Sequence, residues 1–312
     1  MAFTATDVKN LREMTGVGMM DCKKALTESD GDIDKAIDWL REKGLAAAQK
    51  KAGRIAAEGV AYAEVIGGVG VVVEVNAETD FVAKNEKFMD FVKGVATAVA
   101  QSAPADLDAL LAAKFPGSDK TVAEQQSEMV LVIGENINTR RFARYTTGVN
   151  VPYIHAGGKI GVMVNLEVEG ISNDAAITEL GKDIAMQIAA MRPTYLDTSS
   201  VDAAELEKER EIQLGLALEE GKTKNLPEEK ALEIAQKKVE GRINKFYEEI
   251  CLLNQPYVKE NKLSVGKHVE QVAKELGGKI KVAAFTRFEK GEGIEKKQED
   301  FAAEIASLTG QK

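Results

Sequence analysis

The chain carries few residues of the types that perform covalent or metal chemistry. Its histidines, His155 and His268, and its cysteines, Cys22 and Cys251, are not spaced for metal binding or nucleophilic catalysis. Neither G-x-x-x-x-G-K-[ST] nor G-x-G-x-x-G occurs, so the sequence has no fingerprint of a phosphate-binding loop. The many carboxylates lie mostly on helical patterns rich in Glu and Lys, where such groups are usually solvated. We therefore predict a binding protein without catalytic residues, metal or cofactor.

A short stretch at residues 79–85 (TDFVAKN) is the strongest candidate for a functional feature. It follows residues 70–76 (GVVVEVN), whose apolar composition predicts a buried strand, and it leads into a helical pattern. Two interpretations fit these residues. In the first, Asp80 caps a helix that begins near Val82 and Phe81 packs as an apolar staple. In the second, Asp80 and Phe81 form a wedge that is presented to another protein.

The composition bounds the class of protein. The 312 residues are enough for about two to four domains, and 44% apolar residues can build several cores. The net charge of −9 argues against nucleic acid as the main partner, because phosphate contacts need a clustered positive surface. The first residues do not resemble a secretory signal, and no apolar run approaches the ~20 residues that cross a membrane. We expect a cytoplasmic protein in which Cys22 and Cys251 are reduced thiols.

The beginning of the chain predicts a compact three-helix unit of the ubiquitin-associated type. Thr6 is the expected cap of the first helix, whose inner face would carry Val8, Leu11 and Met14. Asp32 is the expected cap of the third helix.

Met19 and Met20 are neighbours on the second predicted helix, so both cannot point into the small core. At least one is expected to face a partner, because the flexible side chain of Met suits an adaptable binding surface. The alternative, in which both are half-buried in the core, stays open. The Ala-rich residues 44–57 predict a linker helix, which completes an N-terminal domain of residues 1–57.

The middle of the chain contains an internal repeat with an offset of 91 residues. In each copy, two strands around a glycine turn are followed by an apolar helical pattern, and the helices are offset by 92 residues. We predict two copies of an α+β unit, each a small antiparallel sheet with helices on one face, in residues 58–150 and in residues 151–200 with 251–290. The matching positions are Tyr62 and Tyr153, Gly67 and Gly158, Val69 and Ile160, Gly70 and Gly161, Val71 and Val162, and Val73 and Val164.

Residues 201–250 predict an antiparallel helical hairpin with a coiled-coil seam, inserted into the second copy. Pro227 is well placed in the first turn of the second helix. Such a hairpin cannot hide both faces by itself, so its tip is expected to meet another molecule. The apolar face is expected to contain Leu206, Leu214, Ala217 and Leu218 on the first helix and Leu232, Ala235, Val239, Arg242, Phe246 and Ile250 on the second.

The end of the chain returns to a strand and then a helix. Residues 279–288 alternate as a strand should, and the glycines at 291 and 293 end the strand. Residues 291–312 form the predicted C-terminal module, whose mobile helix is expected to dock on another surface. Its apolar face would consist of Phe301, Ala302, Ile305 and Leu308.

Four motifs resemble those of one family. Residues 14–26 (MTGVGMMDCKKAL) and 79–85 (TDFVAKN) look like the two signatures of bacterial elongation factor Ts. Residues 133–138 (IGENIN) and 287–295 (RFEKGEGIE) are similar to two further motifs of that family. The predicted order also fits: a three-helix unit, a duplicated α+β core, a helical hairpin and a C-terminal module. The resemblance covers nearly the whole chain.

The resemblance implies a nucleotide exchange factor for elongation factor Tu, the GTPase that carries aminoacyl-tRNA to the ribosome. It also implies that the stretch from Thr79 to Val82 carries a wedge, with Asp80 and Phe81 entering the partner's G domain near the switch II helix. There they would disturb the groups that hold the magnesium ion. The resemblance also implies that this chain does not bind the nucleotide directly.

The resemblance implies further contacts with the same partner. Ile133 and Gly134 would make a second contact with the G domain, and His155 would contact the third domain and reach the phosphate loop from the far side. Met19, Met20 and Lys23 would form an N-terminal docking patch, and the segment after Gly293 would be the C-terminal module.

Other classes of function stay open at this point. A passive adaptor or chaperone, built on the three-helix unit and the hairpin, would bind tightly without affecting nucleotide release. An RNA-binding accessory factor is disfavoured by the charge of −9. The hairpin also raises the question of a homodimer or a 2:2 complex with the partner.

Overall fold

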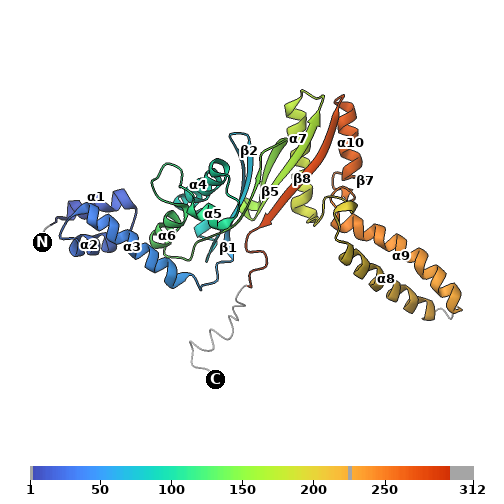
Figure 1. Ribbon diagram of the computed structural model, residues 1–312, viewed down its shortest axis with the longest axis horizontal. Helices are drawn as coiled ribbons and strands as arrows, with labels where there is room; N and C mark the ends of the chain where they lie inside the picture. Colours follow the sequence, from blue (N-terminus) through green and yellow to red (C-terminus); the bar gives the residue numbers. More distant parts are fainter. Residues whose placement is uncertain (1–2, 224–226, 296–312) are drawn as a thin grey trace, which may run out of the picture.

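The computed structural model describes residues 3–223 and 227–295 of the chain. The molecule is elongated: three N-terminal helices lie at one end, two small sheets with their helices lie in the middle, and two long helices project at the other end (Figure 1). Helices combined with separate antiparallel sheets define the α+β class, as predicted. The predicted helix with Phe301, Ala302, Ile305 and Leu308 lies outside the described residues.

Three helices, α1 (Ala5–Thr15), α2 (Met19–Glu28) and α3 (Ile33–Lys51), form the N-terminal unit. The predicted cap at Thr6 is wrong, because Thr4 caps α1. The Thr4 hydroxyl accepts a hydrogen bond from the amide of Asp7, and the Asp7 carboxylate accepts one from the amide of Thr4. This reciprocal capping box satisfies two amides at once, which explains why the helix begins before Thr6. Asp32 caps α3 as predicted.

The predicted inner face of α1 is correct for Val8 and Leu11, which are buried, but wrong for Met14, which is largely exposed. The helix ends at Thr15, and Gly16 turns the chain with a φ of 69°. Because the core of this unit is small, the last apolar position of α1 projects beyond it.

The predicted third helix and most of the predicted linker helix are one continuous helix, α3, and residues 52–57 are not helical. The second half of α3 packs along α6 (Val122–Ile133). Leu131 and Val132 of α6 also pack against the core of the three-helix unit. The N-terminal unit is therefore joined to the rest of the molecule through α6.

Two three-stranded antiparallel sheets form the centre of the molecule. The first has the order β1-β2-β3 and the second the order β4-β5-β8. Both hairpins predicted from the repeat are present, and each gains a third strand from later in the chain. The strands are β1 (Glu58–Ile66), β2 (Val69–Ala77), β3 (Asn138–Tyr145), β4 (Val149–His155), β5 (Ile160–Glu169) and β8 (Lys279–Glu289).

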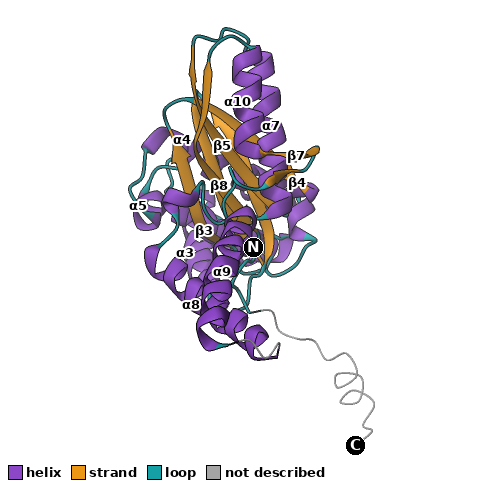
Figure 2. Ribbon diagram, turned by 90° about the vertical axis from the view of Figure 1, so that its right-hand side faces the viewer, coloured by secondary structure: helices purple, strands orange, loops and turns teal. Residues whose placement is uncertain are grey.

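Helices cover the outer face of each sheet. In the first repeat α4 (Glu86–Ser102) packs on β1 and β2, next to α5 (Leu107–Ala112) and α6. In the second repeat α7 (Asp174–Met191) packs on β4 and β5, and α10 (Val265–Glu275) packs on β8 (Figure 2). Each repeat thus has its own buried core between sheet and helices.

The two sheets pack against each other through their other faces, around buried Ala63, Val72 and Met163. Glycines at matching positions of the repeat permit this close approach. A Cβ on Gly161 would lie 3.0 Å from the backbone of Ala61, and one on Gly70 would lie 2.8 Å from the side chain of Asn150. The packing therefore explains why these positions are glycine in both copies.

A helical hairpin, α8 (Ala203–Thr223) and α9 (Glu228–Ile250), projects from the second repeat (Figure 1). The predicted seam is wrong in part: Leu232 is exposed, and Ile243 is buried instead of its neighbour Arg242. The Arg242 guanidinium pairs with Glu220 across the hairpin, so it lies at the edge of the seam. The division of the chain into domains stays a prediction.

Short elements complete the second repeat at the base of the hairpin. They are η3 (Thr198–Ser200), β6 (Pro256–Tyr257) and β7 (Glu260–Ser264). The buried amide of Gln187 on α7 donates to the Gln255 side chain and to the Pro256 carbonyl, both at 3.1 Å. This satisfied polar pair fixes the base of the hairpin on the core.

Candidate functional site

The loop after β2 places Phe81 in solvent. The residue is 79% exposed, whereas the next residue, Val82, is buried and begins the short 3-10 helix η1 (Val82–Lys84). The interpretation as cap and staple is therefore wrong. Helix α4 begins only at Glu86, where the Asn85 side chain accepts hydrogen bonds from the amides of Lys87 and Phe88, and the 3-10 helix has no side-chain cap. Asp80 is exposed beside Phe81.

Two carboxylates hold this loop against the loop that follows α6. Glu135 accepts hydrogen bonds from the amide and the hydroxyl of Thr79, at 2.9 and 2.7 Å. In the opposite direction, Glu78 accepts a hydrogen bond from the amide of Asn136 at 2.6 Å. We call these two carboxylates and their partners, Thr79 and Asn136, the carboxylate clasp. It brings together two stretches that the sequence analysis singled out separately, residues 79–82 and 133–134.

The C-terminal end of α3 is bonded to the same loops. The Lys51 ammonium donates to the carbonyl of Gly134, and the side chain of Asn136 donates to the carbonyl of Arg54 at 2.8 Å. Gly134 ends α6 with a φ of 86° and is exposed, while Ile133 is half-buried against the core of the first repeat. Of this predicted pair, Gly134 is therefore the more accessible residue.

His155 ends β4 and is exposed. Its Nδ1 atom lies 3.0 Å from the hydroxyl of Tyr153, which orients the ring. The turn after it, η2 (Ala156–Gly158), contacts β1, and the 3-10 helix after Phe81 contacts the same strand. The turns next to His155 and Phe81 therefore belong to different repeats but contact the same strand.

The predicted docking patch lies on α2, away from these loops along the molecule (Figure 1). Met20 is 74% exposed, Met19 and Lys23 are also exposed, and Cys22 on the opposite side of the helix is buried. Both methionines are exposed, so the alternative in which both are half-buried in the core is wrong. That at least one of them faces a partner stays a prediction. Met14 adds a third exposed methionine, which the sequence analysis assigned to the core.

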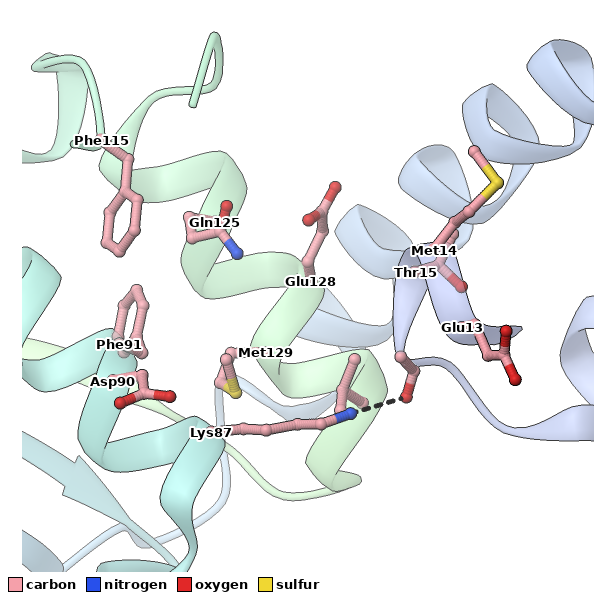
Figure 3. Close-up of a pocket in the computed structure, with 12 residues that line it drawn as sticks. Glu13, Met14, Thr15, Lys87, Asp90, Phe91, Phe115, Gln125, Glu128 and Met129 are labelled. Atoms are coloured by element: carbon pink, nitrogen blue, oxygen red, sulfur yellow. Dashed lines mark hydrogen bonds between the residues drawn. The ribbon is translucent and has the colours of Figure 1, made fainter. Parts of the chain in front are cut away.

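A cleft of about 360 Å³ separates the end of α1 from α4 and α6 (Figure 3). At its base the rings of Phe91 and Phe115 stack with centroids 5.8 Å apart. Across it, the Lys87 ammonium donates to the carbonyl of Gly16 at 3.3 Å, as the dashed line in Figure 3 shows. The cleft is thus part of the joint between the three-helix unit and the core.

The thiols are poorly suited to nucleophilic chemistry. Both cysteines are free and buried. Burial raises the pKa of Cys22, and burial, with a smaller effect of the Asp197 charge, raises the pKa of Cys251 to about 11. Both thiols are therefore protonated near neutral pH.

Two other kinds of site, a metal centre and a membrane-spanning helix, are absent from the described residues. Among residues 3–223 and 227–295, no group of three or more His, Cys, Asp or Glu side chains could hold a metal ion. In the same part of the chain, no helix has the length and apolar character needed to cross a membrane.

Exposed apolar side chains on rigidly held loops and helices are typical of proteins that act by binding other proteins. A family profile described as Elongation factor TS matches residues 78–292. The chain is 51% identical to elongation factor Ts of Syntrophotalea carbinolica, over 99% of this chain and 100% of the relative. It is 50% identical to elongation factor Ts of Clostridium perfringens strain 13, over 98% and 99%, and 48% identical to that of Trichlorobacter lovleyi, over 100% of both.

The chain therefore belongs to the elongation factor Ts family. Membership of this family supports a role in translation elongation.

Proposed function

We propose that this chain is a guanine-nucleotide exchange factor for elongation factor Tu in the cytoplasm. It binds the GDP-loaded partner and promotes GDP release by disturbing the Mg²⁺ site and the phosphate loop, after which GTP binds. The exchange makes and breaks no covalent bond, and this chain need not touch the nucleotide. The observation that carries the proposal is the exposed Phe81 beside Asp80 on a loop held by the carboxylate clasp.

The energetics rest on linkage. A protein that binds the nucleotide-free GTPase better than the loaded one weakens nucleotide affinity by the same factor. Each tenfold of weakening requires about 1.4 kcal/mol of differential binding. Burial of a Phe side chain contributes about 1.5–3 kcal/mol, so Phe81 alone supplies about one to two powers of ten. Asp80 adds negative charge near the metal site and so disfavours the bound phosphates.

The other exposed residues provide the remaining contacts in this proposal. Gly134, with Ile133 beside it, touches the G domain next to the wedge, and His155 engages the third domain of the partner. Because the turns next to Phe81 and His155 both contact β1, the two contacts with the partner are linked through one strand. Met19, Met20 and Lys23 dock the three-helix unit on the partner.

Release of fluorescent GDP from elongation factor Tu, followed by stopped flow, tests the wedge. Phe81→Ala is expected to lower the accelerated rate about 10- to 100-fold, which corresponds to the loss of its burial energy. Val258→Ala is the matched control, because Val258 is also an exposed apolar residue but lies on the turn between β6 and β7. An unchanged rate with Phe81→Ala would falsify the wedge.

The alternative function is a non-catalytic adaptor or chaperone. It is favoured by Met14, Met19 and Met20, which are exposed apolar residues on the three-helix unit. This alternative predicts tight binding to elongation factor Tu with no change in GDP release, so the same stopped-flow experiment separates the two functions.

A homodimer or a 2:2 complex through the hairpin is supported by Ile212 and Leu216, which are exposed four residues apart on α8. Sedimentation equilibrium of the free chain tests the homodimer, and the same measurement on its complex with elongation factor Tu tests the 2:2 assembly. The mass of a monomer in the first measurement would contradict the homodimer, and the mass of a 1:1 complex in the second would contradict the 2:2 assembly.

A further inference from the structure

A buried carboxylate lies at the centre of the first sheet. Glu74 on β2 is fully buried and accepts hydrogen bonds from Arg141 Nε at 2.5 Å and from Arg140 Nη1 at 3.0 Å. It also accepts from the side chain of Asn76 at 3.0 Å and from the backbone amide of Gly291 at 2.8 Å. A buried carboxylate is retained only when its desolvation is offset by such bonds. The Gly291 bond is distinctive, because this residue comes after the last strand of the other repeat.

Gly291 is held where no other residue fits. Its φ is +70°, and a Cβ there would lie 2.0 Å from the carbonyl oxygen of Ala57. On either side of it, the Lys290 ammonium pairs with Glu58 at 2.5 Å, and Arg140 donates to the carbonyl of Glu292 at 2.6 Å. The chain that leaves β8 is therefore fixed on the first repeat, next to the start of β1.

The repeat supplies an internal comparison. Asn165 matches Glu74 at the offset of 91 residues, and a bulge comes after both positions, in β5 and in β2. The Asn165 amide donates to the carbonyl of Thr147 at 2.5 Å, on the segment that leaves the first repeat. Each repeat thus uses the polar residue before its bulge to hold the chain that leaves the other repeat.

The two held residues, Thr147 and Gly291, lead into segments of different kinds. After Thr147 the chain enters β4, which a full ladder of strand pairing ties to β5. After Gly291, the described residues up to 295 have no strand pairing. The neutral amide of Asn165 is sufficient at Thr147, because the segment that follows is a paired strand. At Gly291 the bonds of residues 290–292 must hold the chain, and there the charged carboxylate of Glu74 accepts hydrogen bonds from several donors.

Resting on the proposed function, we propose that Glu74 is a positioning residue for the C-terminal module. It fixes Gly291, and with it the place on the first repeat from which the chain continues into this module. In this proposal the module contributes to binding of the partner. The carboxylate does not touch the partner. Its loss lowers the affinity of the complex and leaves the maximal rate of GDP release, which the wedge sets, unchanged.

Amide hydrogen exchange of Gly291, measured by NMR on the full chain, tests the anchor directly. The wild-type amide is expected to be protected, and Glu74→Gln to accelerate its exchange by about tenfold or more, because a charge-assisted bond is lost. Exchange of the wild-type amide at the rate of an unprotected peptide would overturn the anchor. This measurement does not involve elongation factor Tu.

A titration of GDP release with each full-length variant tests the positioning role. Glu74→Gln is expected to raise the half-saturating concentration about tenfold and to leave the maximal rate within about twofold. The double variant Glu74→Gln/Arg140→Gln removes a charge of each sign, so it provides a second test if the single variant does not fold. Asn165→Ala is the matched control, since it removes the corresponding bond of the other repeat and leaves Gly291 in place.

The outcomes separate the anchor from the proposed function. A wild-type half-saturating concentration in both folded Glu74 variants would overturn the positioning role, as would a reduced maximal rate or an equal effect of Asn165→Ala. If the wild-type chain does not accelerate GDP release at all, the proposed function fails and the positioning role falls with it. Protection of Gly291 would then still establish the anchor as a feature of the fold.

Discussion

At the scale of single residues, the position of Phe81 is fixed by its neighbours in the chain, Thr79 and Val82. Thr79 is bound through its amide and hydroxyl to Glu135, and Val82 is buried in the core of the first repeat. The ring is therefore held between two fixed residues, and little conformational freedom of the backbone remains to be lost on binding. Preorganisation of this kind decides how much of the burial energy of a Phe side chain appears as affinity.

Replacing Glu135 by Ala is expected to slow GDP release from elongation factor Tu about three- to tenfold at subsaturating concentration, since two bonds that fix the loop are lost. Glu135→Gln retains an acceptor for one of them and should keep most of the activity. Stopped-flow release of fluorescent GDP measures both variants. Equal rates for Glu135→Ala and the wild type would show that the loop keeps its place without the clasp.

What the sequence reveals at this scale depends on the residue. Two adjacent methionines on one helix cannot both be buried in a small core, and Met19 and Met20 are indeed exposed. The sequence alone does not decide whether Asp80 is a helix cap or part of a wedge, because a polar residue between a strand and a helix also predicts a cap. The intervening 3-10 helix moves the start of α4 to Glu86 and gives the cap to Asn85. Asn85 is also a polar residue of this stretch, so considering every such residue as a possible cap would have included it.

At the scale of elements, the turn η2 after His155 is built from two glycines with different constraints. Gly157 has a φ of +64°, and a Cβ there would meet nothing within 4 Å. Gly158 has a φ of +95°, and a Cβ there would lie 2.8 Å from Cγ1 of Val60. The first position demands only a left-handed conformation, whereas the second also permits the contact of the turn with β1.

Gly157→Ala is expected to cost about 1–2 kcal/mol of unfolding free energy, from the left-handed conformation alone. Gly158→Ala should cost about 1–3 kcal/mol more, because the added methyl group must displace Val60 or the turn. Urea unfolding measures both free energies. Equal costs at the two positions would mean that the turn is not packed on β1 in solution.

The elements themselves were largely predictable, and their pairing was not. The offset of 91 residues predicts both hairpins because the strands, glycines and helices recur together. The pattern of residues 279–288 also predicts a strand, but nothing local shows that it pairs with β5 across the inserted hairpin. Likewise, the predicted seam of α9 omits the buried Ile243, because several registers of apolar residues fit one helix equally well.

At the scale of the whole molecule, hydrogen bonds join parts that are distant in the sequence. Lys51 at the end of α3 binds the carbonyl of Gly134, and Arg54 pairs with Glu78 at 3.5 Å, so the helix that carries the N-terminal unit is attached to the carboxylate clasp. Glu74 attaches the end of the second repeat to the first. Such long-range polar contacts leave no periodic signal in the sequence, and a structure is needed to find them.

The Glu74 anchor predicts how stability depends on pH. Burial raises the pKa of this carboxyl group, but hydrogen bonds from Gly291, Asn76, Arg141 and Arg140 outweigh burial and bring the pKa below its ordinary value of 4.5. The folded state therefore prefers the charged form. The resulting stabilisation is complete above pH 4.5 and is lost as the pH falls through the lowered pKa of the folded state.

Glu74→Gln is expected to reduce the unfolding free energy at pH 7 by about 3 kcal/mol, the low end of the cost of breaking a buried ion pair, since both arginines are partly exposed. The difference from the wild type should shrink below pH 4.5 as the wild-type carboxylate is protonated. Glu220→Gln, which removes an exposed carboxylate paired with Lys238 and Arg242, should change stability less. Urea unfolding between pH 7 and pH 3 measures these differences. A difference between wild type and Glu74→Gln that stays constant over this range would show that folding does not lower the pKa of Glu74.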